Sequence, residues 1–181
     1  MVNHPKDSTG SVYFNHGRDS HPWATKITQL AKVAQAKGFS VESLDYTGIL
    51  DPDQRVQILL DSAKTDIRPL ILVGSSMGGY VATVASEILK PQGLFLMAPA
   101  VYMQGYAVQD PCPSAEIIFI IHGWNDELIP VEHSIRFARK HQAHLHLVKS
   151  DHRLIDQLAT IEWLFRRFLD QLVSMTARTK G

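Results

Sequence analysis

One segment of the sequence places a serine between glycines at a spacing that could make its hydroxyl reactive. It has the sequence G-S-S-M-G at residues 74–78. The motif follows the apolar run 70–73, and its serine at 76 begins a segment of helical period over 76–89. The pattern G-x-S-x-G marks a serine exposed on a sharp turn between a strand and a helix. Glycines at 74 and 78 fit that turn because side chains there would collide where strand and helix converge. We therefore expect Ser76 in an uncommon backbone conformation at the helix N-terminus.

Glycine-rich turns after a strand have other uses. Segment 74–79 contains neither G-x-G-x-x-G nor G-x-x-x-x-G-K-[ST], the patterns of dinucleotide and phosphate loops, and this excludes the cradle that those loops form. A plain turn that closes a strand–helix unit stays open as the alternative. The partners of the serine decide between the two interpretations.

A serine hydroxyl becomes a nucleophile when a base removes its proton and an acid orients that base. In this kind of turn, the partners follow in the order Ser, Asp or Glu, His, each beyond a later strand. Asp126 lies in the first loop after the apolar run 117–121, and His152 follows the run 144–148. Either residue alone is as well explained by a turn, a cap or a surface position. Their joint order and placement predict Asp126 as the acid and His152 as the base.

Asp151 stands next to His152 but is not the predicted acid. Side chains of sequence neighbours usually diverge, so we interpret Asp151 as a loop or cap residue. The base must be neutral to accept a proton, and an imidazole ordinarily gains its charge near pH 6.5. Activity should therefore fall in acid, and a rate that stays flat from pH 5 to 8 would contradict the assignment.

A tetrahedral oxyanion needs two preorganised N–H donors. The backbone N–H of Met77, directly after the serine, is the first candidate. The second is the N–H of Arg18 in the loop after the first predicted strand, where Gly17 lets the backbone turn. The pair 16–17 could instead simply end that strand, and the Arg18 guanidinium could meet an acidic substrate group or solvent.

Apolar runs of strand length alternate with segments of helical period along the whole chain. Strands are predicted over 12–15, 40–44, 70–73, 94–97, 117–121 and 144–148, and helices over 23–37, 53–65, 76–89, 131–140 and 153–173. Alternation of this kind predicts a parallel sheet covered on both faces. We expect about six strands in the order 2-1-3-4-5-6, and ligands beyond their carboxyl ends. Apolar residues at 154, 158, 161, 165, 168 and 172 predict one narrow buried face on the last helix.

Composition limits the class of protein. The 181 residues carry 18 Lys and Arg against 18 Asp and Glu, 45% are hydrophobic and 20% charged. A packed globular domain spanning 1–181 is expected, whereas nucleic-acid binding and membrane-surface binding both need a basic excess. Cys112 is the single cysteine, and the first residues have no apolar stretch. These features predict a cytoplasmic protein without disulfides or a membrane span; the oligomeric state stays open.

Other side chains could serve the same site. Trp124, Tyr102, Met103 and Tyr106 lie in loops expected at the same edge of the sheet and could line a substrate pocket, although packing under a loop explains them equally well. His144 and His146 share one face of a strand, but no third ligand is spaced to join them. No metal and no cofactor are predicted.

The chain resembles small α/β-hydrolases over nearly its whole length. The motif L-V-G-S-S-M-G-G-Y at 72–80, with S-H-P at 20–22 and K-I-T-Q-L at 26–30, is similar to the lidless bacterial esterases of the YqiA-like family. The segments at 45–48, 122–130 and 150–153 resemble the α/β-hydrolase-domain acyl-protein thioesterases. The resemblance implies a three-layer α/β-hydrolase fold without a cap and Ser76, Asp126 and His152 as its triad.

The resemblance also implies an activity, namely hydrolysis of a carboxylic ester or thioester of a small to medium acyl group. Two departures bear on the substrate: Arg18 stands where such families often have Phe, Tyr or Leu, and residues 99–116 are too few for the cap that the thioesterases carry. A catalytically silent binding protein with this fold, or an acyltransferase with the same triad, would show the same residues.

Overall fold

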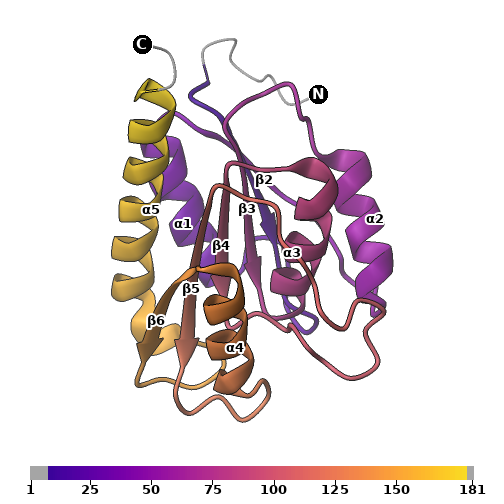
Figure 1. Cartoon of the computed structure of the whole chain (residues 1–181). Coiled ribbons are helices and arrows are strands. Elements are labelled where there is room, and N and C mark those ends of the chain that lie inside the picture. The colour runs from indigo at the N-terminus through magenta and orange to yellow at the C-terminus, as the bar shows by residue number, and fades with distance from the viewer. Residues whose placement is uncertain (1–7, 179–181) are drawn as a thin grey trace.

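Six parallel strands form one sheet in the order β2-β1-β3-β4-β5-β6. This arrangement comes from a computed structural model, which describes residues 8–178 (Figure 1). The strands are β1 (Ser11–Asn15), β2 (Ser40–Ser43), β3 (Leu70–Ser75), β4 (Gly93–Met97), β5 (Ile117–Gly123) and β6 (His144–Val148). The helices are α1 (Thr25–Ala36), α2 (Pro52–Ser62), α3 (Met77–Leu89), α4 (Val131–His141) and α5 (Leu158–Arg178), with the short 3-10 helix η1 (Ile155–Gln157) before α5. The predicted strand order and fold class are confirmed.

The helices cover the sheet on both faces, α1 and α5 on one and α2, α3 and α4 on the other (Figure 1). Successive side chains of a strand point to opposite faces. In β3, Ile71 and Val73 pack with α1 and α5, whereas Leu70 and Leu72 pack with α2, α3 and α4. A strand buried on both sides must be apolar throughout, which explains the continuous apolar runs.

The last helix differs from its prediction at both the start and the buried face. The helix begins at Leu158 rather than at Arg153, because Leu154 has a left-handed backbone and Asp151 Oδ1 accepts hydrogen bonds from the N–H groups of residues 153 and 154. Leu164 and Leu169 are also buried, so the buried face of α5 is wider than predicted.

The carboxyl ends of the strands meet at one edge of the sheet. The register pairs Asn15 with Gly74, Ser75 with Met97, and Gly123 with Val148. The loops after β1, β3, β5 and β6 therefore leave the sheet side by side. Those loops, together with the first residue of α3, contain every residue predicted to take part in the chemistry.

The connection 99–116 between β4 and β5 forms turns and packs on the helices instead of building a cap. Its Val108 N–H donates to the Tyr80 hydroxyl at 3.1 Å, and Asp110 pairs with Lys140 at 2.6 Å. Within residues 8–178, none of the helices combines the length and apolarity needed to span a bilayer.

Candidate active site

Ser76 occupies the turn between β3 and α3 with φ 56° and ψ −122°. A non-glycine residue rarely adopts such a backbone, and strain of this kind is typical of functional sites. A Cβ on Gly78 would lie 1.9 Å from the Asn15 carbonyl oxygen, and one on Gly74 would lie 2.2 Å from the Gly78 carbonyl oxygen. Both glycine predictions and the predicted uncommon conformation of Ser76 are confirmed.

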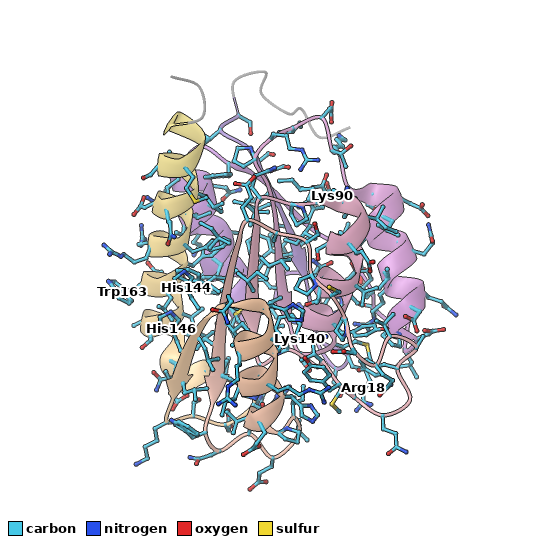
Figure 2. The ribbon with its side chains drawn as sticks, viewed as in Figure 1. Arg18, Lys90, Lys140, His144, His146 and Trp163 are labelled. Atoms are coloured by element: carbon cyan, nitrogen blue, oxygen red, sulfur yellow. The ribbon has the colours of Figure 1, made fainter. Side chains whose placement is uncertain are left out.

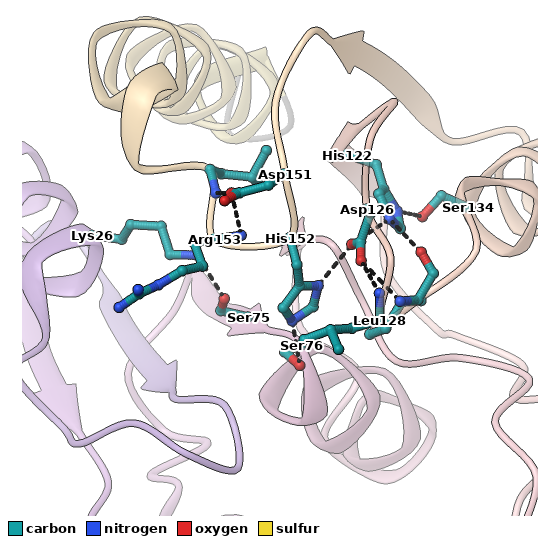
Figure 3. Close-up of polar contacts among 12 residues, drawn as sticks. Lys26, Ser75, Ser76, His122, Asp126, Leu128, Ser134, Asp151, His152 and Arg153 are labelled. Atoms are coloured by element: carbon teal, nitrogen blue, oxygen red, sulfur yellow. Dashed lines mark hydrogen bonds and ion pairs between the residues drawn. The ribbon is translucent and has the colours of Figure 1, made fainter.

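Ser76, His152 and Asp126 form one hydrogen-bonded chain (Figure 3). His152 Nε2 lies 3.0 Å from Ser76 Oγ, and His152 Nδ1 lies 2.7 Å from Asp126 Oδ2. A carboxylate only accepts, so Nδ1 carries the proton and Nε2 is free to accept from the serine hydroxyl. The three side chains come from loops 50 and 26 residues apart in sequence, yet they meet with the geometry of a nucleophile, a base and an orienting acid.

The Asp126 carboxylate is fully buried and accepts four hydrogen bonds. Its Oδ1 receives the backbone N–H groups of Leu128 at 2.9 Å and Ile129 at 2.8 Å, and its Oδ2 receives His152 and His122. Burial by itself raises the pKa of Asp126, but the hydrogen bonds from His122, His152 and Ile129 outweigh burial and hold that pKa well below its ordinary value. The carboxylate therefore stays ionised next to His152.

His122, at the end of β5, is held in one orientation from both ring nitrogens. Its Nε2 donates to Asp126 Oδ2 at 2.9 Å, and its Nδ1 lies 2.7 Å from Ser134 Oγ on α4. The ring is completely buried. Because the carboxylate only accepts, Nε2 carries a proton, and Nδ1 pairs with the Ser134 hydroxyl.

The loop after β1 lies directly against the serine. A Cβ on Gly17 would lie 3.3 Å from Ser76 Cβ and 3.8 Å from Ser76 Oγ. His16 is buried beneath this loop; its Nε2 accepts the Tyr46 N–H at 3.0 Å and its Nδ1 donates to the Gly17 carbonyl at 2.8 Å. Burial lowers the pKa of His16. A proton on Nε2 would break the bond from Tyr46, so His16 is held as a neutral structural residue.

Arg55 of α2 fixes the direction of the peptide groups in that loop. Its buried guanidinium donates to the carbonyls of His16 and Gly17, each at 3.3 Å, and to that of Arg18 at 3.5 Å. In a trans peptide the N–H points opposite to the C=O. Because the Gly17 carbonyl faces Arg55, the Arg18 N–H is directed away from Arg55. Met77 N, the first N–H of α3, has no partner within its own helix.

Comparison with known families identifies the lineage of this chain. The profile of the uncharacterised protein family UPF0227 matches residues 11–110. The chain belongs to this family. The matched part of the UPF0227 protein contains Ser76 and the loop after β1, whereas Asp126 and His152 lie beyond it.

Solved structures place the UPF0227 protein in the α/β hydrolase superfamily. A candidate hydrolase of that superfamily from Xanthomonas campestris pv. campestris is 35% identical, with a TM-score of 0.82, 91% of this chain covered and 99% of the other. A second protein from Xanthomonas campestris, described as a serine hydrolase without lid, has the same fold at 17% identity and a TM-score of 0.65, with 92% and 85% of the chains covered.

A curated relative matches a shorter stretch. The human protein ABHD12B is 30% identical over an alignment of 99 residues, which covers 49% of this chain and 27% of ABHD12B. The match between the UPF0227 protein and this relative thus spans about a quarter of the length of ABHD12B.

A cavity of about 710 Å³ opens beside Ser76, within the range of small-molecule sites. Its apolar lining includes Ile27, Met77, Met103, Tyr106 and Ile129. Met103 and Tyr106 therefore lie where they were expected.

Two other predicted pocket residues are not brought to this cavity. The Tyr102 ring packs against Phe137 and His133 on α4, and the Arg136 guanidinium lies 4.0 Å from its centre. Trp124 is 54% exposed and is not among the lining residues. The expectation that Tyr102 and Trp124 line the substrate pocket is corrected, because adjacent residues of the loop 99–116 point to opposite sides and Trp124 turns outward.

The two strand histidines lie apart from the cavity. Figure 2 shows His144 and His146 with Trp163 on the side formed by β6 and α5, and Arg18 at the end of the molecule where the strands finish. Both histidine rings pack against Phe119. Among residues 8–178, no three His, Cys, Asp or Glu side chains are grouped to hold a metal ion; the absence of a metal and of a cofactor stays a prediction.

Several residues of this site were not found from the sequence. His122, Arg55 and Lys26 each contact the triad loops or the cavity. His122 is part of a buried strand end, Arg55 falls within an amphipathic helix, and Lys26 reads as an ordinary surface lysine of α1. Sequence spacing does not reveal these contacts, because each joins one of the three side chains to a group that lies far away along the chain.

Proposed function

We propose that this UPF0227 protein is a serine hydrolase that cleaves carboxylic esters or thioesters of small to medium acyl groups. The observation that supports this most directly is the position of His152, whose ring lies 3.0 Å from Ser76 Oγ on one side and 2.7 Å from Asp126 on the other. In this proposal Ser76 is the nucleophile, His152 the general base and Asp126 the acid that orients it.

Acylation proceeds in two steps. His152 Nε2 takes the proton of Ser76 as Oγ forms a bond to the carbonyl carbon, and the carbonyl oxygen becomes an oxyanion. The same Nε2 then gives its proton to the oxygen of the leaving alcohol, or to the sulfur of the leaving thiol. The bond between that atom and the carbonyl carbon breaks in the same step. Asp126 stays ionised and stabilises the imidazolium of His152, in line with the lowered pKa of Asp126.

The N–H groups of Met77 and Arg18 receive the oxyanion. Met77 N opens α3, where the helix dipole favours negative charge. Arg55 contributes as a positioning residue, because it holds the carbonyls of the loop so that the Arg18 N–H points away from it. A preorganised donor of this kind contributes about 10²- to 10³-fold to the rate in other serine hydrolases.

Deacylation uses water and the same groups. His152 removes a proton from water as the water oxygen adds to the acyl carbon. The bond from that carbon to Ser76 Oγ then breaks, and His152 returns the proton to Oγ. The product is a carboxylic acid, and no metal or cofactor takes part. The cavity of about 710 Å³ and the absence of a cap over residues 99–116 support acyl groups of small to medium length.

Labelling with a fluorophosphonate, followed by assay on p-nitrophenyl esters from acetate to palmitate, tests the proposal. We expect the wild type to be labelled, with the adduct mapped by mass spectrometry to Ser76 and not to Ser75, and to hydrolyse the shorter esters fastest. Ser76→Ala should lose both properties. Ser174→Ala, which removes an exposed hydroxyl on α5, is the matched control and should retain both.

Two outcomes would reject the assignment. Labelling that survives Ser76→Ala would exclude Ser76 as the nucleophile. Absence of labelling and of ester hydrolysis in the folded wild type would favour a silent binding protein instead. Adding an alcohol or amine to the assay separates hydrolysis from acyl transfer, because a transferase would form the new ester or amide in place of the free acid.

A further inference from the structure

The cavity beside Ser76 is more cationic than the chain as a whole. Its lining includes Arg18, Lys26 and Arg153 against one carboxylate, that of Asp19, whereas the complete chain has a net charge of zero. Asp19 pairs with Arg18 at 3.3 Å, and both side chains are exposed at the rim. Lys26 and Arg153 therefore leave an excess of positive charge in the cavity.

Lys26 is the most enclosed of these cations. It extends from the first turn of α1 toward β3, and its Nζ donates to Ser75 Oγ at 3.1 Å, one residue before the nucleophile (Figure 3). Across residues 8–178, no carboxylate lies within ion-pair distance of this ammonium. One of the three N–H groups of Lys26 donates to Ser75 Oγ, and two remain for a ligand. The Ser75 hydroxyl accepts this bond and can still donate its own O–H to a ligand.

The charges around Lys26 do not neutralise it. Burial lowers the pKa of Lys26 to about 8, while Asp151 and Asp126 act in the opposite direction and Arg153 adds to the lowering. These two charges act from a distance: Asp151 is exposed and its Oδ1 accepts the N–H groups of residues 153 and 154, whereas Asp126 accepts its own four donors. Folding thus encloses an ammonium that no carboxylate of residues 8–178 contacts directly, an arrangement that a ligand with an anionic group would improve.

We propose that the cavity takes esters or thioesters that carry a carboxylate away from the scissile bond, and that Lys26 pairs with that carboxylate. This inference rests on the proposed hydrolase function and adds the class of substrate. A carboxylate matches the single charge of this ammonium, and its second oxygen can accept from the adjacent Ser75 hydroxyl. The carboxylate can belong to the acyl part or to the alcohol part.

Matched pairs of substrates test the inference and separate these two sources. Methyl hydrogen adipate and methyl adipamate differ only in a carboxylate or an amide on the acyl side, and 4-acetoxybutyrate and 4-acetoxybutanamide differ in the same way on the alcohol side. The measured quantity is kcat/KM for the carboxylate divided by kcat/KM for the amide. We expect this ratio to exceed about ten for at least one pair in the wild type at pH 7, as for a charged hydrogen bond.

Substitution of Lys26 should then remove the preference. Lys26→Met should lower the ratio about tenfold, mainly through KM of the carboxylate substrate, and Lys26→Arg should keep a large part of it. Lys32→Met removes an exposed lysine from the same helix and should leave the ratio as in the wild type. Raising KCl from 0.05 to 0.5 M should also reduce the wild-type ratio, which tests the inference even if Lys26→Met does not fold.

The outcomes distinguish this inference from the proposed function. If the wild type hydrolyses both members of each pair with equal kcat/KM, or if Lys26→Met leaves a high ratio unchanged, the carboxylate inference is overturned while the hydrolase remains. If the wild type hydrolyses none of the four esters, no p-nitrophenyl ester, and takes no fluorophosphonate label, the hydrolase itself is rejected.

Discussion

His122 and His152 donate to the same oxygen of one buried carboxylate. Their ring nitrogens lie 2.9 Å and 2.7 Å from Asp126 Oδ2, one from the end of β5 and the other from the loop after β6. His122 has no path to Ser76 because it is completely buried and is bound on its other side by Ser134. We therefore interpret His122 as the residue that positions Asp126, and His152 as the base.

Removing the donor at residue 122 should slow the reaction through Asp126. His122→Leu is expected to lower kcat about tenfold with little change in KM, as for other residues that orient a catalytic ligand. His122→Gln keeps an N–H donor and should recover most of kcat. A purely structural role would lower the free energy of unfolding and leave kcat of the folded protein unchanged.

The loop after β1 should depend on Arg55 for its direction. Arg55→Met is expected to lower kcat about 10- to 100-fold, because the Arg18 N–H loses its fixed position. Arg68→Met is a matched control: Arg68 donates to the carbonyls of Leu89 and Lys90, far from the site. Both variants should lose stability in urea unfolding, but only the first should lose kcat. Equal loss of kcat in both would refute the positioning role of Arg55.

The free energy of unfolding should depend on pH through Asp126. The pKa of Asp126 is lowered in the folded state, so its contribution is fully present above the ordinary pKa of about 3.9 and is lost as the pH falls through the lower folded value. Asp126→Asn should therefore be less stable than the wild type by roughly 1–3 kcal/mol at pH 7, and the difference should shrink at pH 3. Urea unfolding at both pH values measures it.

Asp61→Asn is the control for that experiment. Asp61 is an exposed carboxylate on α2, and its replacement should change the free energy of unfolding little at either pH. If the difference between the wild type and Asp126→Asn were instead larger at pH 3 than at pH 7, the Asp126 hydrogen bonds would not be those described.

Lys26 should give a pH dependence of the same sign in base, because its folded-state pKa is also lowered. Its pKa is lowered to about 8 by burial, so between about pH 8 and 10 the unfolded chain binds a proton that the folded protein has released. The free energy of unfolding of the wild type, relative to Lys26→Met, should rise with pH across that interval. Urea unfolding at pH 7.5, 8.5 and 9.5 tests this, with Lys32→Met as a control that shows no such trend. A flat or falling difference would contradict the burial of an unpaired ammonium.

The sequence determined the order of the elements and the three residues whose side chains meet. Apolar runs at 70–73 and 117–121 predicted buried parallel strands, and parallel strands bring their carboxyl ends to one edge. A residue placed just after a strand is therefore located by topology alone, which explains why the spacing of Ser76, Asp126 and His152 was sufficient. The role of the glycines at 74 and 78 could also be predicted from the sequence, because the strand and the helix approach too closely at the turn to leave room for a Cβ.

Only the tertiary structure decided which neighbours support those residues. Arg55, His122 and Lys26 act through carbonyl, carboxylate and hydroxyl groups supplied by other elements. The side-chain directions of Tyr102 and Trp124 likewise follow from how their loops pack. A linear pattern records periodicity and local turns, whereas a hydrogen bond between residues dozens of positions apart exists only after the sheet and helices have brought them within about 3 Å.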